Sequence, residues 1–522
     1  MTMRLDRPMA RAVVESFDLA GTMRTEAMEA ASIEIDQLDH AMTARRLARE
    51  LGLTVDELGL DGLFAAEEVL TVGTHFGTHL DAPTHFGDQV AGHPAATVDR
   101  MPLDPLFAEA VTLDFRALGI EAITAAHLQA ALAAADHTLA PGQMVITRTG
   151  IEDGYEDDPS IRQRGAGLDR SAIDWLLERG IGLTATDSMT QDMPIPWMEG
   201  RFREGDRDAY FPVHLAGKRA DYTHVEKANG LRGLPGPNGY RVAAFPIKVE
   251  GGSGAWCRFH ALRDLPFDPA RATVHDLTQP IRRHSMESEE SIVRTHGSAR
   301  RQRQWAKQLA VRVGEIEPRG AWDQVIASTR AGTHLAAPYR FGPEAGGRDA
   351  RTVDQVPLDW CLGRGVMLDV VAADRTVAID RAELVRALET AGHALRTGDI
   401  VLLRTGAEDH FEGDPGYPRS GRGIAVEALE YLVERGVRVI GSDAESLDRP
   451  IDAMLADRRA GVRDALYPVH LGARRLEHLQ VLKLGGLGRL PADRDLYIDV
   501  APIKVESAGS GWCRAVAFTT GG

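Results

Sequence analysis

Short apolar runs alternate with amphipathic segments along the chain. Four of the runs are rich in Val, Ile, Leu and Thr, and they lie at residues 109–115, 143–149, 180–187 and 241–249. Runs of this length and composition are typical of buried strands. Two segments between them, 125–135 and 170–180, repeat their apolar residues every three to four positions, which predicts helices, the second ending at Gly180. The alternation predicts an α/β fold.

The same arrangement occurs twice in the sequence. VITRTGIEDGYEDDP in the first half returns as VLLRTGAEDHFEGDP in the second, and FPIKVEGGSGAWCR returns as APIKVESAGSGWCR. The amphipathic segment LDHAMTARRLARELG likewise has a counterpart in ARRQRQWAKQLAVRVG. We therefore predict two tandem copies of one α/β domain, separated near the stretch RDLPFDPARA and comprising residues 1–270 and 271–522.

Composition narrows the class of protein. The chain has 522 residues, 43% of them hydrophobic, and a net charge of −16, which disfavours nucleic acids and anionic membranes as partners because phosphate surfaces need clustered Lys and Arg. No stretch approaches the ~18 apolar residues of a membrane helix, and the amino terminus is too polar for a signal peptide, so we expect a cytoplasmic protein. Cys257, Cys361 and Cys513 are expected to be buried, reduced thiols.

The stretch TVGTHFGTHLDAPTHFG holds four residues of metal-ligand type. His75, His79, Asp81 and His85 all have odd numbers, so an extended chain would direct their side chains to one face. A lone histidine is usually structural, but four such residues within eleven positions predict a metal cradle. Imidazole and carboxylate ligands suit Zn²⁺, Mn²⁺ or Fe²⁺ rather than ions that prefer thiolates.

A helical arrangement of these histidines, as in zincin motifs, is disfavoured by the sequence. Gly77 lowers helix propensity, Pro83 is expected to break a helix, and no Glu stands beside the first histidine. The extended arrangement is therefore the prediction for this segment.

The stretch HFGTHLDAPTHF resembles the signature H-x-G-T-H-x-D-x-P-x-H-F of the cyclase superfamily, a metal-dependent group that includes bacterial kynurenine formamidases, isatin hydrolases and aromatic polyketide ring cyclases. The resemblance implies a swivelling β/β/α-like fold, a divalent metal cofactor, zinc or manganese, and an acid/base role for His85. A later His and Glu, twelve residues apart, complete the family's ligand set. The implied metal ligands are His75, His79, Asp81, His214 and Glu226. His224 is expected to support this site or to lie on the surface.

The resemblance leaves three functions open for a small-molecule substrate. The region from HLAGKRADYTHVEKANG to GAWCR looks more like that of polyketide second- and third-ring cyclases, and the chain after FDLA lacks the Trp and Pro-Gly-Asp pattern associated with kynurenine formamidases. An aromatic polyketide ring cyclase, closing a ring by aldol reaction and dehydration, is therefore the first expectation. The alternatives are hydrolysis of an aryl formamide, cyclic amide or lactone, and a non-catalytic metal-binding assembly protein.

The second copy lacks most of the implied site. GTHLDAPTHFG becomes GTHLAAPYRFG, and the corresponding replacements are Arg330 for His75, Ala336 for Asp81, Arg340 for His85 and Leu482 for Glu226. Arginine stays protonated and offers no lone pair, so we predict that the second site holds no metal. Two explanations remain: simple decay of a duplicated domain, or arginines that bind an anionic group of a substrate or partner.

Family members commonly form dimers, so the resemblance implies that the two copies form an intramolecular pseudo-dimer. We expect the second copy to stand where a partner subunit would and to complete the pocket wall around the first site. A further homo-oligomer stays open.

Overall fold

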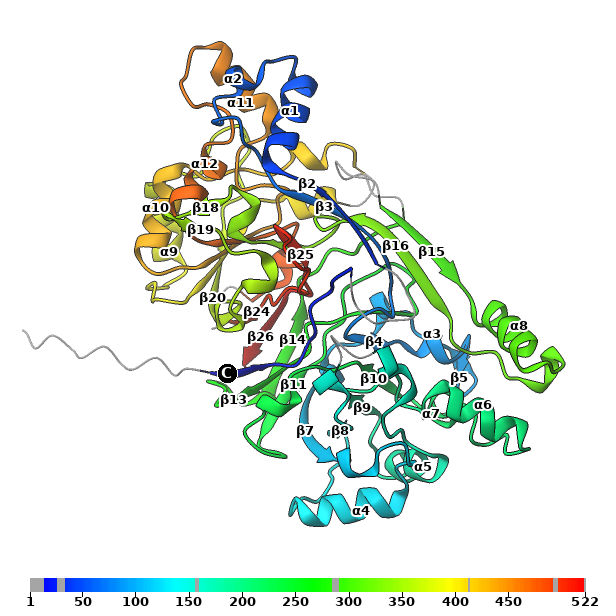
Figure 1. The fold of residues 1–522 in the computed structure, drawn as a ribbon. Helices are drawn as coiled ribbons and strands as arrows, with labels where there is room; N and C mark the ends of the chain where they lie inside the picture. Colours follow the sequence, from blue (N-terminus) through cyan, green and yellow to red (C-terminus); the bar gives the residue numbers. More distant parts are fainter. Residues whose placement is uncertain are drawn as a thin grey trace, which may run out of the picture.

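Each half of the chain forms a nine-stranded mixed sheet (Figure 1). The computed structural model describes residues 14–25, 33–154, 159–283, 291–411, 414–491 and 496–520. In spatial order the first sheet contains β1 (Glu15–Asp18), β13 (His260–Arg263), β11 (Tyr240–Ala243), β7 (Phe107–Asp114), β8 (Met144–Arg148), β9 (Leu183–Thr186), β10 (Thr223–Glu226), β4 (His79–Asp81) and β12 (Gly254–Trp256).

The second sheet repeats this order strand for strand. It contains β14 (Ala272–Asp276), β26 (Val516–Thr520), β24 (Leu496–Asp499), β20 (Leu362–Asp369), β21 (Ile400–Arg404), β22 (Val439–Ser442), β23 (Leu479–Leu482), β17 (His334–Ala336) and β25 (Ser510–Trp512). The four central strands of each sheet are parallel and the flanking strands are antiparallel. The structure thus has two tandem α/β copies; the boundary near residue 270 stays a prediction.

Helices cover one face of each sheet because their apolar stripes meet the sheet's apolar side chains. In the first copy Leu128 and Leu176 pack on Val111 and Val145. The covering helices are α4 (Ala125–Ala134), α5 (Arg170–Leu177) and α7 (Pro212–Ala216) in the first copy, and α9 (Arg381–Thr390), α10 (Val426–Glu434) and α12 (Pro468–Arg475) in the second.

The strands and helices predicted for the first copy form in the structure, and one of the strands is shorter than expected. The runs at 109–115, 143–149 and 180–187 match β7, β8 and β9, and both expected helices form. The run at 241–249 leaves the sheet at Ala243, just before Pro246, which has no backbone N–H to donate to a neighbouring strand.

Each copy extends an arm over the other copy (Figure 1). The first arm, residues 34–73, holds β2 (Glu34–Leu38), α1 (His40–Leu51), α2 (Val55–Leu58) and β3 (Glu67–Gly73). The second arm, residues 292–328, holds β15 (Ile292–His296), α8 (Ser298–Leu309) and β16 (Trp322–Ser328). Strands β3 and β16 pair antiparallel, so one four-stranded sheet, in the order β15-β16-β3-β2, contains strands of both copies.

The helices of the arms dock reciprocally. On the first arm, Leu47 and Leu60 pack against Met454 of α11 (Ile451–Arg459) and Leu466 in the second copy. On the second arm, Trp305 packs against a cluster of the first copy that includes Met198 of α6 (Ile195–Arg203) and Phe211. Each copy therefore carries an element of the other above its functional face.

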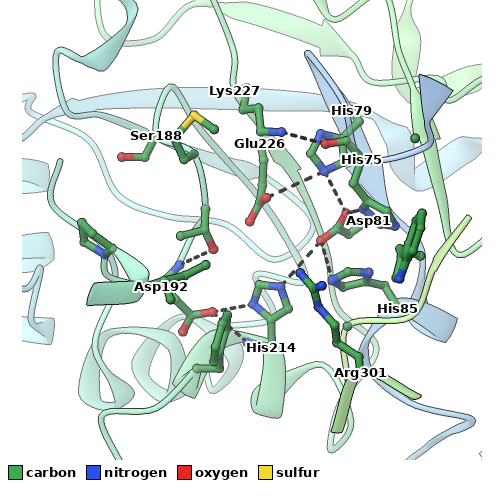
Figure 2. A pocket seen from close by; sticks show the side chains of 18 of the residues that line it. His75, His79, Asp81, His85, Ser188, Asp192, His214, Glu226, Lys227 and Arg301 are labelled. Carbon is green, nitrogen blue, oxygen red and sulfur yellow. Dashed lines mark hydrogen bonds and ion pairs between the residues drawn. The ribbon is translucent and has the colours of Figure 1, made fainter. Parts of the chain in front are cut away.

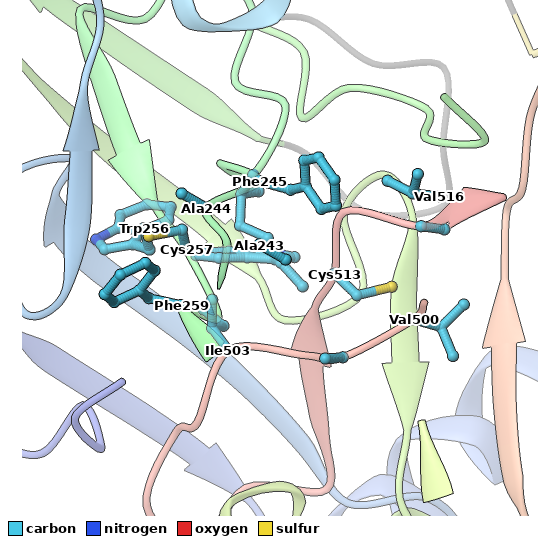
Figure 3. Packing of buried hydrophobic residues seen from close by; sticks show 14 of the residues in the cluster. Ala243, Ala244, Phe245, Trp256, Cys257, Phe259, Val500, Ile503, Cys513 and Val516 are labelled. Carbon is cyan, nitrogen blue, oxygen red and sulfur yellow. The ribbon is translucent and has the colours of Figure 1, made fainter. Parts of the chain in front are cut away.

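The two copies share one hydrophobic core (Figure 3). The rings of Trp256 and Trp512, both buried, stack across the junction with centroids 4.9 Å apart. The buried guanidinium of Arg258 donates to the carbonyl of Pro502, and Arg514 makes the reciprocal bond to Pro246. This exchange of identical contacts is the pattern of a two-fold dimer interface, so the chain is an internal pseudo-dimer.

The three cysteines are free and buried, as expected. Across the described ranges, no helix combines the length and the apolar character that crossing a membrane requires.

Candidate metal centre

The predicted site residues come from five separate elements of the first copy. His79 and Asp81 lie on β4, and His75 precedes them in the turn after β3. His85 lies on the short helix α3 (Pro83–Phe86). His214 lies on α7 and Glu226 ends β10, the strand that pairs with β4.

The prediction of one extended face from residue 75 to residue 85 was wrong at both ends. Gly77 adopts φ 61°, a left-handed conformation that glycine enters freely, and turns the chain between His75 and β4. Pro83 begins α3 instead of breaking a helix, because proline is well tolerated in the first helical turn, where an N–H needs no partner. The turn and the helix fold both ends back over β4, so the histidines still converge.

The six residues gather around Asp81 (Figure 2). His75 Nδ1 lies 2.6 Å from Asp81 Oδ1, His79 Nε2 lies 3.7 Å from Glu226 Oε2, and His214 Nε2 lies 3.9 Å from Asp81 Oδ2. Two groups of ligand-type residues share Asp81, and the atoms within each group lie within 4.8 Å of one another. The groups are His75, His79 and Asp81, and Asp81, His214, His224 and Glu226. These distances fit a common metal centre.

His79 shows that the cluster suits a cation. Its Nδ1 donates to the carbonyl of Gly77 at 2.8 Å, so Nε2 carries a lone pair. Burial lowers the pKa of this ring and keeps it neutral. Nε2 is buried and has no hydrogen-bond partner among the described residues, and it lies 3.1 Å from a carboxylate oxygen of Asp81. A buried lone pair facing a carboxylate is unfavourable unless a positive ion lies between them.

Asp192 orients the His214 ring so that its Nε2 also faces the cluster. The Asp192 carboxylate accepts the Nδ1 proton of His214 and also the backbone N–H of Val213 at 2.7 Å. The His214 Nε2 lone pair therefore points to the cluster. A carboxylate behind a histidine is the arrangement that commonly orients metal ligands. Sequence reasoning missed Asp192, because nothing in the local pattern distinguishes it from other acidic residues.

His224 belongs to the cluster, so of its two expected positions, supporting the site or on the surface, the structure has the first. It is fully buried, and its Nε2 lies 2.9 Å from Asp81 Oδ2 and 3.2 Å from Glu226 Oε1. Burial alone would lower its pKa, but the two carboxylates raise it to about 10. His224 precedes Glu226 by two positions on β10, so both face the same side of the strand. That alternation was the sequence signal for its place.

The second arm holds His85 in place. The His85 Nδ1 donates to the carbonyl of Ala321 at 2.6 Å, while the backbone N–H groups of Gly320 and Ala321 donate to the His85 carbonyl at 2.8 and 3.2 Å. Burial holds the pKa of the ring well below its usual value, so the imidazole is neutral. Its unprotonated Nε2 faces the cluster, 3.5 Å from Asp81 Oδ2. The second copy thus selects the tautomer that can accept a proton.

A cavity of about 580 Å³ opens above the cluster. Its walls come from both copies: Ile195 and Phe211 belong to the first copy, and Arg301, Trp305 and Trp322 belong to the second arm. The size and the mixture of aromatic walls with a few polar groups are those of a small-molecule site.

The equivalent region of the second copy is filled by the first arm. Arg330 Nη1 contacts the buried Glu67 carboxylate at 2.9 Å, so the anionic group it meets comes from within the chain. The Phe64 ring stacks on His470 at 4.9 Å, and the Phe64 carbonyl accepts the Nε2 proton of that histidine. In the part of the chain that the structure describes, no group of three or more ligand-type residues gathers here.

His334 illustrates the change in electrostatics between the copies. It corresponds to His79 and keeps the equivalent Nδ1 bond, to the carbonyl of Gly332 at 3.1 Å. Burial lowers the pKa of its ring, and the positive charges of Lys483 and Arg330 lower it further. Lys483 has a counterpart in Lys227 of the first copy, so the change comes from Arg330 and from the loss of the carboxylates at Ala336 and Leu482.

Comparison with known proteins gives matches to both halves. A sequence model of a family described as "Putative cyclase" matches residues 6–193 and 275–449. A curated relative, the kynurenine formamidase of Erythrobacter litoralis (strain HTCC2594), is 26% identical over 193 residues, covering 37% of this chain and 74% of that protein.

Solved structures with detectable similarity cover about half of the chain each. An isatin hydrolase bound to the product analogue thioisatinate is 18% identical with a TM-score of 0.39, and the match covers 48% of this chain and 94% of that one. Isatin hydrolase A from Labrenzia aggregata, bound to benzyl benzoate, is 20% identical with a TM-score of 0.38, covering 49% and 96%.

Proposed function

This chain belongs to the putative cyclase family, and on that premise we propose that its first copy is a divalent-metal-dependent hydrolase. The substrate class is an aryl formamide, cyclic amide or lactone. The observation that carries the proposal is the buried lone pair of His79 facing carboxylates, with the neutral imidazole of His85 beside them. The curated relative's name, kynurenine formamidase, supports hydrolysis within the family.

The same proposal assigns one divalent ion, zinc or manganese, to the cluster around Asp81. The residues proposed to hold the metal are His75, His79, Asp81, His214 and Glu226. Imidazole nitrogens with carboxylate oxygens are the donors that both ions accept. Lewis acidity is the chemistry that such an ion supplies when bound, since it polarises a carbonyl and lowers the pKa of water.

His85 is proposed to move the proton. Its Nε2 accepts a proton from the water that attacks the substrate carbonyl carbon, and the same atom passes this proton to the departing nitrogen or oxygen. One carbon–oxygen bond forms to the water oxygen and the bond to the leaving group breaks, so no other reactant is needed. Ala321 keeps Nδ1 engaged, which leaves Nε2 free to act.

Ring closure of an aromatic polyketide uses the same groups and is the second candidate. The likeness of the region HLAGKRADYTHVEKANG to polyketide cyclases favours it. There His85 would remove a proton α to a carbonyl instead of a proton of water. A purely metal-binding role is disfavoured because the neutral His85 lies beside the cluster in an open cavity.

The test combines metal analysis with turnover of simple aryl formamides and aryl lactones. The wild-type chain, purified and supplied with zinc or manganese, should retain metal and hydrolyse at least one of these classes. Asp81→Ala should lose both properties. His85→Ala should keep the metal and lose ~10²- to 10⁴-fold in kcat. His93→Ala, an exposed histidine on the nearby strand β6 (His93–Pro94), is the matched control and should change neither.

Three results would reject the proposal: wild-type protein without bound metal, His85→Ala with full activity, or conversion of β-polyketones without hydrolysis of any amide or lactone. The last result would select ring closure.

A further inference from the structure

Helix α8 of the second arm brings one arginine into the cavity above the metal centre. Arg301 lines the cavity (Figure 2), and its guanidinium carbon lies 5.2 Å from the centroid of the Trp305 ring. Trp305 is buried and stacks on Phe211 at 4.9 Å, which fixes the helix against the first copy. Arg301 is therefore held at the cavity wall by its contact with a ring that is itself packed against the first copy.

The Arg301 guanidinium has no ionic partner in the part of the chain that the structure describes. Among the residues that the structure describes, no carboxylate lies within ion-pair distance of it, and its polar contact is the side-chain oxygen of Gln304 at 3.3 Å. The carboxylates that line the cavity already have other partners. Asp192 accepts from His214, Asp323 accepts from Ser253 at 2.6 and 2.7 Å, and the remaining carboxylates belong to the proposed metal site. A guanidinium stays protonated, so when the metal site is loaded the charge of Arg301 has no carboxylate of the cavity to pair with.

The two arms differ at this position. Helices α1 and α8 have the same length, and aligning their first residues, His40 and Ser298, places Thr43 opposite Arg301 and Leu47 opposite Trp305. Among the described residues, the Thr43 hydroxyl donates to backbone carbonyls of its own helix and its cap. At these two helix positions the arm that covers the first site carries a cation and a large aromatic ring, whereas the arm that covers the second site carries Thr43 and Leu47.

We propose that Arg301 binds a carboxylate of the substrate, and that the substrate is therefore an aromatic acid derivative whose reacting carbonyl lies at the metal centre. A guanidinium forms two parallel hydrogen bonds with a carboxylate, and Lys cannot reproduce that fork. The aromatic walls of the cavity, Phe211, Trp305 and Trp322, suit the ring that joins the two groups. The reaction in this inference rests on the proposed hydrolase function. The binding of a carboxylate by Arg301 does not depend on that function.

The experiment compares two probes that differ by one carboxylate, 2-formamidobenzoate and formanilide. The wild-type, metal-loaded chain should have the higher kcat/KM for 2-formamidobenzoate. Arg301→Gln should lower that value on the order of 10- to 100-fold, mainly through KM, while changing formanilide turnover less than about 3-fold. The kcat/KM of Arg301→Lys for 2-formamidobenzoate should lie between those of the wild type and Arg301→Gln. Arg303→Gln, on the exposed face of the same helix, is the matched control and should behave as wild type.

Calorimetric binding of 2-aminobenzoate and of aniline to the same proteins gives a readout without turnover. Arg301→Gln should weaken 2-aminobenzoate at least 10-fold and leave aniline unchanged. Equal losses for both compounds of a pair, or no loss for either, would overturn the assignment of Arg301. If the wild-type chain hydrolyses neither probe, the proposed reaction fails and calorimetry alone decides the role of Arg301.

Discussion

The ion pair between Arg330 and Glu67 occupies the region of the second copy that corresponds to the metal centre of the first, and it allows a quantitative prediction. Glu67 is 5% exposed, and besides Arg330 it contacts Arg46 and lies 3.9 Å from Arg340. Arg330→Met would leave this carboxylate buried with weaker compensation. Removing one partner of a buried pair costs about 3 to 5 kcal/mol. The side chain of Arg46 is 39% exposed and stays in contact, so we expect the lower end, about 3 kcal/mol.

The double variant separates the pair from the packing. Glu67→Leu together with Arg330→Met removes both charges and leaves apolar side chains of similar size, which is often nearly neutral for stability. We expect the double variant to be more stable than Arg330→Met alone, with a coupling free energy of about 2 kcal/mol.

Equilibrium denaturation in urea, followed by circular dichroism, measures these differences in the free energy of unfolding. Glu50→Gln is the control, because Glu50 forms an exposed pair with Arg46 and should change the stability by less than about 0.5 kcal/mol. Glu67→Leu measured alone completes the cycle. A stability of Arg330→Met equal to wild type, or a double variant destabilised by the sum of Arg330→Met and Glu67→Leu, would refute the reasoning.

Three further predictions concern the fold. Trp305→Ala should cost about 3 to 5 kcal/mol in unfolding free energy and lower activity, because this buried ring docks α8; thermal unfolding and turnover measure both effects. Burial raises the pKa of Asp448 to about 7, so the folded state binds its proton more tightly than the unfolded state and stability should fall by about 4 kcal/mol as pH rises from about 4 to 7. Asp448→Asn should flatten this slope in denaturation curves recorded across that range, whereas an unchanged slope would disprove the assignment. Residues 1–270 expressed alone should aggregate and be inactive, since they lose Ala321 above His85 and expose Trp256; a soluble fragment with full activity would contradict this.

The parts that the sequence predicted are local. Strands β7 to β9 and helices α4 and α5 follow from short-range periodicity, and the same-face placement of His79 and Asp81 follows from the two-residue repeat of a strand. His75 and His85 departed from that repeat because Gly77 and Pro83 act on the backbone in ways that side-chain alternation does not encode.

The parts that the sequence did not predict are contacts between distant segments. The expectation that the second copy completes the pocket wall gave no means of identifying Arg301 or the carbonyl of Ala321 as the groups involved. A backbone carbonyl has no sequence signature at all. Asp192 and His214 meet only because α7 packs beside the loop that holds the aspartate, and tertiary packing of that kind is not periodic.

The pairing of β3 with β16 has a consequence for how the chain is made. A ribosome adding roughly 5–20 residues per second needs on the order of 10–50 s to deliver the second half after the first has emerged. Throughout that interval the nascent first half exposes the edge of β3 and a Trp256 ring that lacks its stacking partner Trp512. Such surfaces invite intermolecular association, so translation speed and chaperone supply should govern the yield of native protein.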